Sequence, residues 1–171
     1  KVLSDGYIRN GKVDHTNIFA SLSHYGEKQL IRLSYINGVQ HTGITWNGAS
    51  PEEIKEYGRK YNSAGMYKDD AGNIRYYDND TDNYYSDILQ LMFSRELSER
   101  LSLNVSLSYT NGYGYYENYR AGSDMIKGDK YSKFSLDNQI VDDVEYKSSQ
   151  LIRRKLLSND FYVANFSLNY N

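Results

Sequence analysis

Hydrophobic and polar residues alternate strictly through residues 101–110 of the stretch LSLNVSLSYTNGYGY, which spans residues 101–115. The odd positions carry large side chains, beginning with Leu101, Leu103 and Val105, whereas the even positions carry Ser, Asn, Thr and Gly. Successive side chains of a strand point to opposite faces of its sheet. This period of two therefore predicts a strand with one large apolar face and one small polar face.

The length and the aromatic end of this strand set it apart from the strands of most soluble sheets. Soluble strands most often have about 5–6 residues. A strand that crosses a bilayer needs about 9–11 residues and is flanked by aromatic residues at the membrane interface. Residues 101–109 supply such an apolar span, and the tyrosines at its end supply the aromatic residues. We therefore expect a strand of a transmembrane β-barrel.

The connections between the predicted strands differ systematically in length. Four further segments alternate in the same way, and they are residues 17–25, 30–40, 84–94 and 161–170. Short turns at residues 26–29 and 95–100 alternate with long loops at residues 47–81 and 117–159, of about 35–45 residues each, far above the usual hairpin length. Short turns at one rim and long loops at the other are typical of outer-membrane barrels.

The predicted fold class is all-β, with antiparallel up-and-down strands that form part of a transmembrane β-barrel. Residues 1–171 are expected to be one partial-barrel segment of about five strands, too few to close a barrel. Both ends of the chain look cut, and we expect a fragment or a mature piece of a longer protein. Within the first long loop, Ser50, Pro51 and Glu53 form a capping-box pattern that predicts a short helix.

Composition narrows the possible functions. The formal net charge of the 171 residues is −2, which argues against a nucleic-acid partner. There is no cysteine, so disulfides and cysteine-ligated zinc are excluded. The mean hydropathy of −0.75 remains compatible with a barrel, because half of its strand residues face a polar lumen. The 19 tyrosines suit a membrane interface or a ligand-contacting surface.

Several segments resemble TonB-dependent outer-membrane receptors. They are HTGITWNGASPEEIKEYGRKYNSAG (41–65), YYDNDTDNYYSDILQLMFSREL (76–97), LSLNVSLSYTNGYGYYENY (101–119) and RRKLLSNDFYVANFSLNY (153–170). With SDGYIRN near the start, the resemblance covers nearly the whole chain and is weakest over residues 121–149. That family builds a barrel of about 22 strands around an N-terminal plug domain. It takes up scarce ligands, chiefly ferric siderophores, haem and cobalamin, and in some branches glycans.

The resemblance implies a segment from the middle of such a barrel, in the outer membrane of a Gram-negative bacterium, with no plug domain. The implied partners are outer-membrane lipid and lipopolysaccharide, the remainder of the barrel and its plug, and a small-molecule ligand. An inner-membrane energy-coupling complex would act through the missing plug.

The acidic segment DNDTDN offers one candidate metal site, made of Asp78, Asp80 and Asp82. Three carboxylates at every second position suit Ca²⁺, which prefers oxygen ligands. The rest of an EF-hand is missing, since Asn83 stands in place of the glycine and Leu89 in place of the bidentate glutamate. The alternative is a solvated acidic loop tip.

Catalytic patterns do not occur in the sequence. His15, His24 and His41 have neither H-x-H nor H-E-x-x-H spacing, and no G-x-S-x-G is present. Paired carboxylates are adjacent in sequence, where side chains diverge. We therefore expect no enzymatic activity and no cofactor.

Aromatic and basic residues near the predicted loops are the candidates for ligand contact. These candidates are Trp46, Tyr113, Tyr115, Tyr116, Arg153 and Arg154. A girdle of interfacial aromatic residues is the alternative for the tyrosines and the tryptophan, and a solvated rim patch is the alternative for the arginines.

The leading functional hypothesis is a segment of a receptor for active uptake of a scarce ligand. The alternative is a secreted or surface β-rich carbohydrate-binding module, and a purely structural barrel is a third possibility. A lipid-facing row must stay apolar over about 25 Å of each strand. Arg32 must therefore point inward. Asp87 shares the parity of Leu89 and Leu91, so it fits only if it lies beyond the hydrocarbon layer, among the tyrosines.

Overall fold

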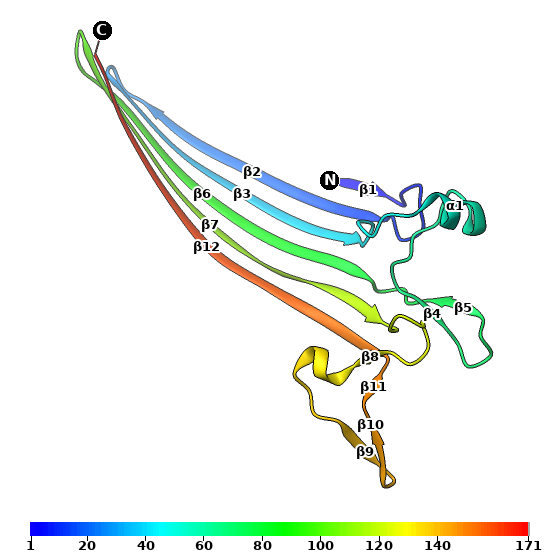
Figure 1. Cartoon of the computed structure of the whole chain (residues 1–171). Helices are drawn as coiled ribbons and strands as arrows, with labels where there is room; N and C mark the ends of the chain where they lie inside the picture. Colours follow the sequence, from blue (N-terminus) through cyan, green and yellow to red (C-terminus); the bar gives the residue numbers. More distant parts are fainter. Residues whose placement is uncertain (171) are drawn as a thin grey trace.

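The computed structural model describes residues 1–170, and Asn171 lies outside the described residues. Six strands form one antiparallel sheet in the order β1-β2-β3-β6-β7-β12 (Figure 1). Within residues 1–170 this sheet is open, with β1 and β12 at its edges. The strands are β1 (Val2–Ser4), β2 (Val13–Tyr25), β3 (Gln29–Gly43), β6 (Thr81–Ser98), β7 (Leu101–Arg120) and β12 (Leu151–Tyr170).

The predicted all-β antiparallel fold is confirmed, and the long connections lie together at one end of the sheet (Figure 1). Turns join β2 to β3 and β6 to β7 at the opposite end. The loop elements are α1 (Pro51–Tyr57), β4 (Met66–Lys68), β5 (Ile74–Tyr76), β8 (Asp129–Lys130), the 3-10 helix η1 (Tyr131–Phe134), β9 (Gln139–Val141), β10 (Val144–Tyr146) and β11 (Ser148–Ser149). In the part of the chain that the structure describes, no helix is both long and apolar enough to cross a membrane.

The predicted helix is present as α1. The Ser50 hydroxyl accepts a hydrogen bond from the Glu53 backbone N–H at 3.2 Å, and the Glu53 carboxylate accepts one from the Ser50 N–H at 2.7 Å. The capping box and Pro51 at the start of the helix therefore confirm the sequence pattern.

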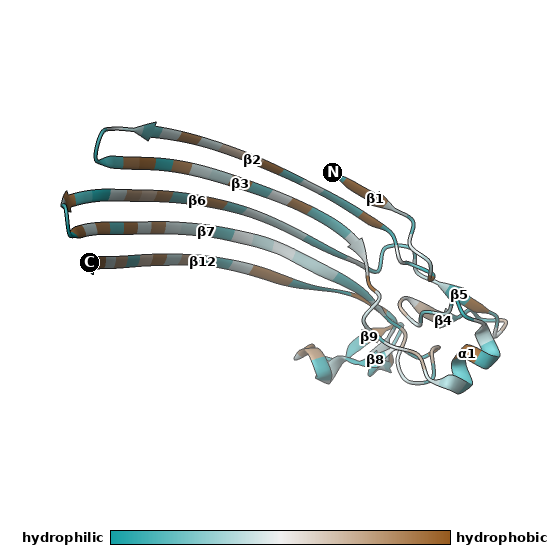
Figure 2. Cartoon of the chain, turned by 90° about the horizontal axis from the view of Figure 1, so that it is seen from above, coloured by the Kyte–Doolittle hydropathy of each residue, from teal (hydrophilic) through white to brown (hydrophobic). Residues whose placement is uncertain are grey.

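Strand register places the hydrophobic residues of neighbouring strands opposite one another. Directly opposed residues of a ladder share a face of the sheet. We call the face that carries Leu33, Leu91 and Leu107 the apolar face, and the face that carries Ser34, Gln90 and Ser108 the polar face. One complete row of the apolar face is Leu22, Leu33, Leu91, Leu107 and Ala164. The hydrophobic positions gather in the half of the strands near the turns (Figure 2).

Nothing in residues 1–170 covers the half of this apolar face that lies near the turns. Leu22 is 74 % exposed and Phe166 is 71 % exposed. The buried hydrophobic residues of the described chain all belong to the loop end, and they are Ile44, Tyr61, Ala64, Ala121 and Tyr131. The sheet therefore presents a broad apolar surface, and the hydrophobic core of the described residues lies among the loops.

On the apolar face, the row directly beyond a row of tyrosines carries two aspartates, Asp87 and Asp160. Asp87 accepts hydrogen bonds from the Tyr35 hydroxyl at 2.5 Å and from the Asn37 amide at 2.9 Å. Two strands further on, Asp160 accepts from the hydroxyl of Tyr109 at 2.6 Å and from the amide of Asn111 at 3.0 Å. An Asp that accepts hydrogen bonds from the Tyr and the Asn of a Tyr-x-Asn sequence on the neighbouring strand thus occurs twice.

Asp87 and Arg32 lie on opposite faces of the sheet. Asp87 lies on the loop side of the tyrosine row, and its neighbours Tyr85 and Tyr113 stack with ring centroids 5.1 Å apart. Arg32 lies on the polar face, where its Nε donates to the Ser23 hydroxyl at 3.0 Å.

Several boundaries differ from the sequence-based prediction. β12 begins at Leu151 and not at residue 161, and β7 continues to Arg120, so the predicted loop 117–159 shrinks to residues 121–150. The predicted turn 95–100 is mostly strand, because β6 runs to Ser98. Cross-strand pairing extends these strands past the point where apolar–polar alternation ends, because the ladder of β12 on β7 continues from Tyr170 to Leu151.

Candidate functional site

Arg9, in the connection between β1 and β2, joins two loops at the base of the site. Its Nη2 donates to the carbonyl oxygen of Asn62 at 2.8 Å, and the same nitrogen donates to the carbonyl of Ala64. The guanidinium also lies 3.8 Å from the ring centroid of Tyr76. Burial lowers the pKa of Arg9. These contacts fix residues 62–76 against the end of the sheet.

Asp80 connects the first long loop to the end of β7. Its carboxylate Oδ1 accepts a hydrogen bond from the Tyr119 backbone N–H at 2.7 Å, and its carbonyl accepts from the Ile44 N–H at 3.0 Å. Asp80 is only 2 % exposed, and this burial raises its pKa.

The proposed calcium ligands are not brought together. Within residues 1–170, no group of three or more His, Cys, Asp or Glu side chains could hold a metal ion, and this includes the set Asp78, Asp80 and Asp82. Asp80 is instead buried, Asp78 is exposed, and Asp82 belongs to β6. The acidic segment therefore acts here as a loop anchor.

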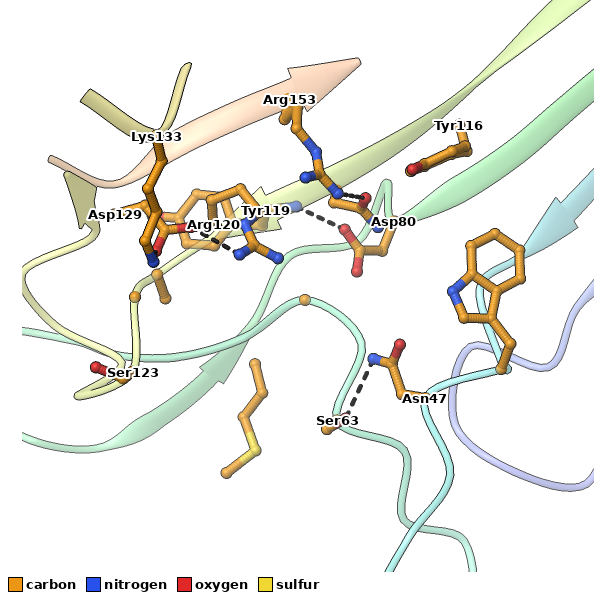
Figure 3. Close-up of a pocket in the computed structure, with 16 residues that line it drawn as sticks. Asn47, Ser63, Asp80, Tyr116, Tyr119, Arg120, Ser123, Asp129, Lys133 and Arg153 are labelled. Atoms are coloured by element: carbon orange, nitrogen blue, oxygen red, sulfur yellow. Dashed lines mark hydrogen bonds and ion pairs between the residues drawn. The ribbon is translucent and has the colours of Figure 1, made fainter. Parts of the chain in front are cut away.

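A pocket of about 520 Å³ opens between the two long loops at the end of β7 (Figure 3). Its volume falls in the range of about 300–1,000 Å³ that is usual for small-molecule sites. Both loops and the ends of two strands line it with Trp46, Asn47, Ser63, Gly65, Met66, Asp80, Tyr116, Asn118, Tyr119, Arg120, Ala121, Gly122, Ser123, Asp129, Lys133 and Arg153.

One wall of the pocket is a buried ion-pair cluster. Asp129 is 3 % exposed, and its carboxylate binds the Lys133 ammonium at 2.6 Å and the Arg120 guanidinium at 2.8 Å. The hydrogen bond from Lys133, followed by that from Arg120, lowers the pKa of Asp129. This cluster holds residues 129–133 against the end of β7.

The other wall is aromatic and cationic. The rings of Trp46 and Tyr116 meet edge to face, with centroids 5.8 Å apart. The Arg153 guanidinium lies 5.8 Å from the Tyr116 centroid, and its Nη2 donates to the Asn118 amide oxygen at 2.8 Å. The Arg153 Nε is buried and has no hydrogen-bond partner within residues 1–170.

The structure brings together three of the six residues proposed for ligand contact, namely Trp46, Tyr116 and Arg153. Strand register places Tyr113, Tyr115 and Arg154 on the opposite, apolar face. The Arg154 guanidinium lies 4.8 Å from the Tyr115 ring centroid and pairs with a buried carboxylate. These three residues therefore lie on the apolar face of the sheet and do not line the pocket.

That buried carboxylate belongs to Glu117, which the sequence reasoning missed. Glu117 is 1 % exposed and accepts hydrogen bonds from the Tyr77 hydroxyl at 2.5 Å, the Asn79 amide at 2.6 Å and the Arg154 Nε at 2.5 Å. It fastens the segment that follows β5 to the apolar face of β7. Its position two residues after Tyr115 places its side chain on the same face as Tyr115, but the sequence-based prediction puts residue 117 in a loop.

Four of the pocket residues that sequence reasoning missed form the hydrogen bonds and ion pairs of its walls, namely Asn118, Arg120, Asp129 and Lys133. Asn118 and Arg120 have the parity of Tyr116, so extending the alternation of β7 by five residues would have placed them on the polar face. Asp129 and Lys133 carry no signal in the sequence, because their position depends on the fold of the second loop.

Comparison of the chain with family models, with curated proteins and with solved structures finds no match. The geometry of the sheet and of the pocket therefore carries the functional argument.

Proposed function

We propose that this chain is a segment of a TonB-dependent receptor in the outer membrane of a Gram-negative bacterium, which takes up a scarce small molecule. The uncovered apolar face carries this proposal, because water is a poor solvent for a contiguous surface of exposed Leu, Val and Phe side chains. Lipid chains on this face, and the remaining barrel strands at its open edges, would satisfy both the apolar side chains and the unpaired backbone.

The dimensions of the apolar face support a membrane location. Residues 101–109 of β7 extend about 30 Å at about 3.4 Å per residue. A tilt of about 40° reduces this to about 23 Å across the membrane, close to the apolar band of about 25 Å in outer-membrane barrels. The tyrosine row that contains Tyr35 and Tyr109 closes the band on the loop side. Interfacial tyrosines are expected at that depth.

The difference in length between the connections at the two ends of the sheet supports one orientation across the membrane. The short turns would face the periplasm and the structured loops the cell exterior, where lipopolysaccharide surrounds them. A pocket between exterior loops is the natural place for the first contact with an incoming ligand. The plug and the inner-membrane coupling complex that energise uptake would act through parts of a longer protein.

Cleavage of intact cells tests both the location and the orientation. A site for a specific protease is inserted after Gly72, in the exposed tip between β4 and β5, or after Glu27, in the turn between β2 and β3. We expect membrane-resident protein that is cut in intact cells at the first site only, and at both sites in permeabilised cells.

A soluble, monomeric protein without membrane association would refute the receptor proposal. The carbohydrate-binding module would then be the better account, with Trp46 as a sugar-contacting residue.

A further inference from the structure

The charges around the pocket of Figure 3 are arranged unevenly. Its two carboxylates, those of Asp80 and Asp129, are 2 % and 3 % exposed and lie within the walls. The cationic side chains are more accessible, with Arg120 37 % and Lys133 57 % exposed. The surface that a ligand would meet is therefore positive, although the complete set of lining residues is nearly balanced.

Arg153 is the cation that has no carboxylate partner. Arg120 and Lys133 share Asp129, whereas Arg153 forms no ion pair within residues 1–170. A guanidinium has five N–H donors, and only the bond to the Asn118 amide oxygen uses one of them. A planar guanidinium with free donors matches the geometry of a carboxylate or a phosphate.

The neighbours of Arg153 add a second cation and a ring. The Lys155 ammonium lies 5.6 Å from the centroid of the Tyr116 ring, which Arg153 also approaches, and Lys155 likewise forms no ion pair in the described chain. Trp46 meets the edge of Tyr116 and is 58 % exposed. An indole at the mouth of a pocket offers a flat surface on which a ring can stack.

We propose that this pocket binds a ring-bearing small molecule that carries a carboxylate or a phosphate, with Arg153 as the residue that pairs with the anionic group. Trp46 contacts the ring, and Lys155 adds to the positive potential. This inference deepens the proposed receptor function and rests on it for the side from which the ligand arrives.

The strand register places this site on the face of the sheet opposite to the one that lipid would cover, away from the phosphates of lipopolysaccharide. Arg153 and Lys155 lie opposite Asn118 and Tyr116 on the polar face, away from the apolar face that lipid would cover. The arginine on the lipid side is Arg154, which Glu117 already neutralises. A soluble anion therefore fits the free guanidinium better than a lipid phosphate does.

The fluorescence of Trp46 reports binding directly, because it is the only tryptophan of the sequence. Detergent-extracted protein is titrated with glucuronate, glucose 6-phosphate and glucose, which share a ring and differ in charge. A Trp46→Phe variant supplies the background emission. We expect at least one of the charged sugars to change the emission of Trp46 and glucose to leave it unchanged, with binding that weakens as salt is added.

Substitutions at Arg153 test whether this residue pairs with the anionic group of the ligand. Arg153→Gln should weaken binding of the charged sugar by about tenfold to a hundredfold, as expected for a charge-assisted hydrogen bond. Arg153→Lys should retain part of the affinity, which separates a loss of charge from a loss of fold. Arg59→Gln is the control, because Arg59 is an exposed cation of the first long loop and does not line the pocket.

Equal binding of glucose, no response to any of the three sugars, or an unchanged affinity of Arg153→Gln would overturn the inference. A response to lipopolysaccharide vesicles alone would reassign the site to lipid phosphates and overturn it as well. Failure of the receptor proposal is distinguishable, since a soluble protein that still binds the charged sugar through Arg153 would refute the membrane location only.

Discussion

Replacing Glu117 with alanine should release the loop segment that follows β5 from the sheet. The substitution removes the acceptor of three hydrogen bonds, from Tyr77, Asn79 and Arg154. A hydrogen bond to a charged group contributes about 1.5–3 kcal/mol, and the contributions of neighbouring bonds are not additive. Tyr77 and Asn79 regain water when they are released, so we expect a loss of about 3 kcal/mol in the local opening free energy.

Hydrogen exchange measures this opening at one well-defined amide. The Tyr77 N–H donates to the Gly65 carbonyl at 2.8 Å, next to the pairing of β4 with β5, and it should exchange faster once the Tyr77 side chain loses its bond to Glu117. A loss of about 3 kcal/mol corresponds to about 100-fold faster exchange. The matched control is Glu27→Ala in the exposed turn between β2 and β3, which should leave the Tyr77 amide unchanged. An unchanged exchange rate in Glu117→Ala would refute the anchoring role of this carboxylate.

Three further predictions address other parts of the chain. The hydrogen bond from Lys133 lowers the pKa of Asp129 in the folded protein. This pair therefore stabilises the second loop fully at pH values above the unfolded pKa of about 4. The stabilisation is lost as the pH falls through the lower pKa that Asp129 has in the folded protein. Limited proteolysis against pH should therefore show loosening in acid, and Asp129→Asn should be loosened already at neutral pH. Ser50→Ala should cost α1 about 1 kcal/mol, measured as about fivefold faster amide exchange in that helix, whereas unchanged exchange would contradict the capping role. Leu107→Arg should cost about 2–4 kcal/mol of stability in the membrane and reduce the fraction of the protein found there. The neighbouring Ser108→Arg lies on the polar face and should insert normally. Equal effects of the two substitutions would contradict the assignment of the faces.

Most of the sheet could be predicted from the sequence, because its strands have one apolar and one polar face. Alternation locates β7 and the second half of β12, where Phe166 and Leu168 lie opposite Val105 and Leu103. It fails in the first half of β12, where leucines and basic residues occupy both faces. In our account that half projects beyond the hydrocarbon layer, so no selection for an apolar face acts on it, and pairing with β7 alone extends the strand.

The candidate site was harder to predict, because its parts come together only in the folded loops. Trp46 and Arg153 are more than a hundred positions apart in the sequence, and both contact Tyr116. The aromatic and basic composition pointed to six residues, but parity of the strand positions divides them between the two faces. For the three tyrosines, that division was available from the alternation of β7. The cluster around Asp129 could not be predicted in this way, because it depends on the path of the second loop.

Lipid should cover the apolar face of the sheet, and water should meet its polar face. The sequence contains no cysteine, so one cysteine introduced at each position from 103 to 109 provides a unique thiol for a spin label. In membranes, collision with oxygen should be high at the odd positions, and collision with a water-soluble nickel complex should be high at the even positions. A period of two in opposite phase for the two reagents is the predicted result. High accessibility to the nickel complex at odd and even positions alike would contradict the account.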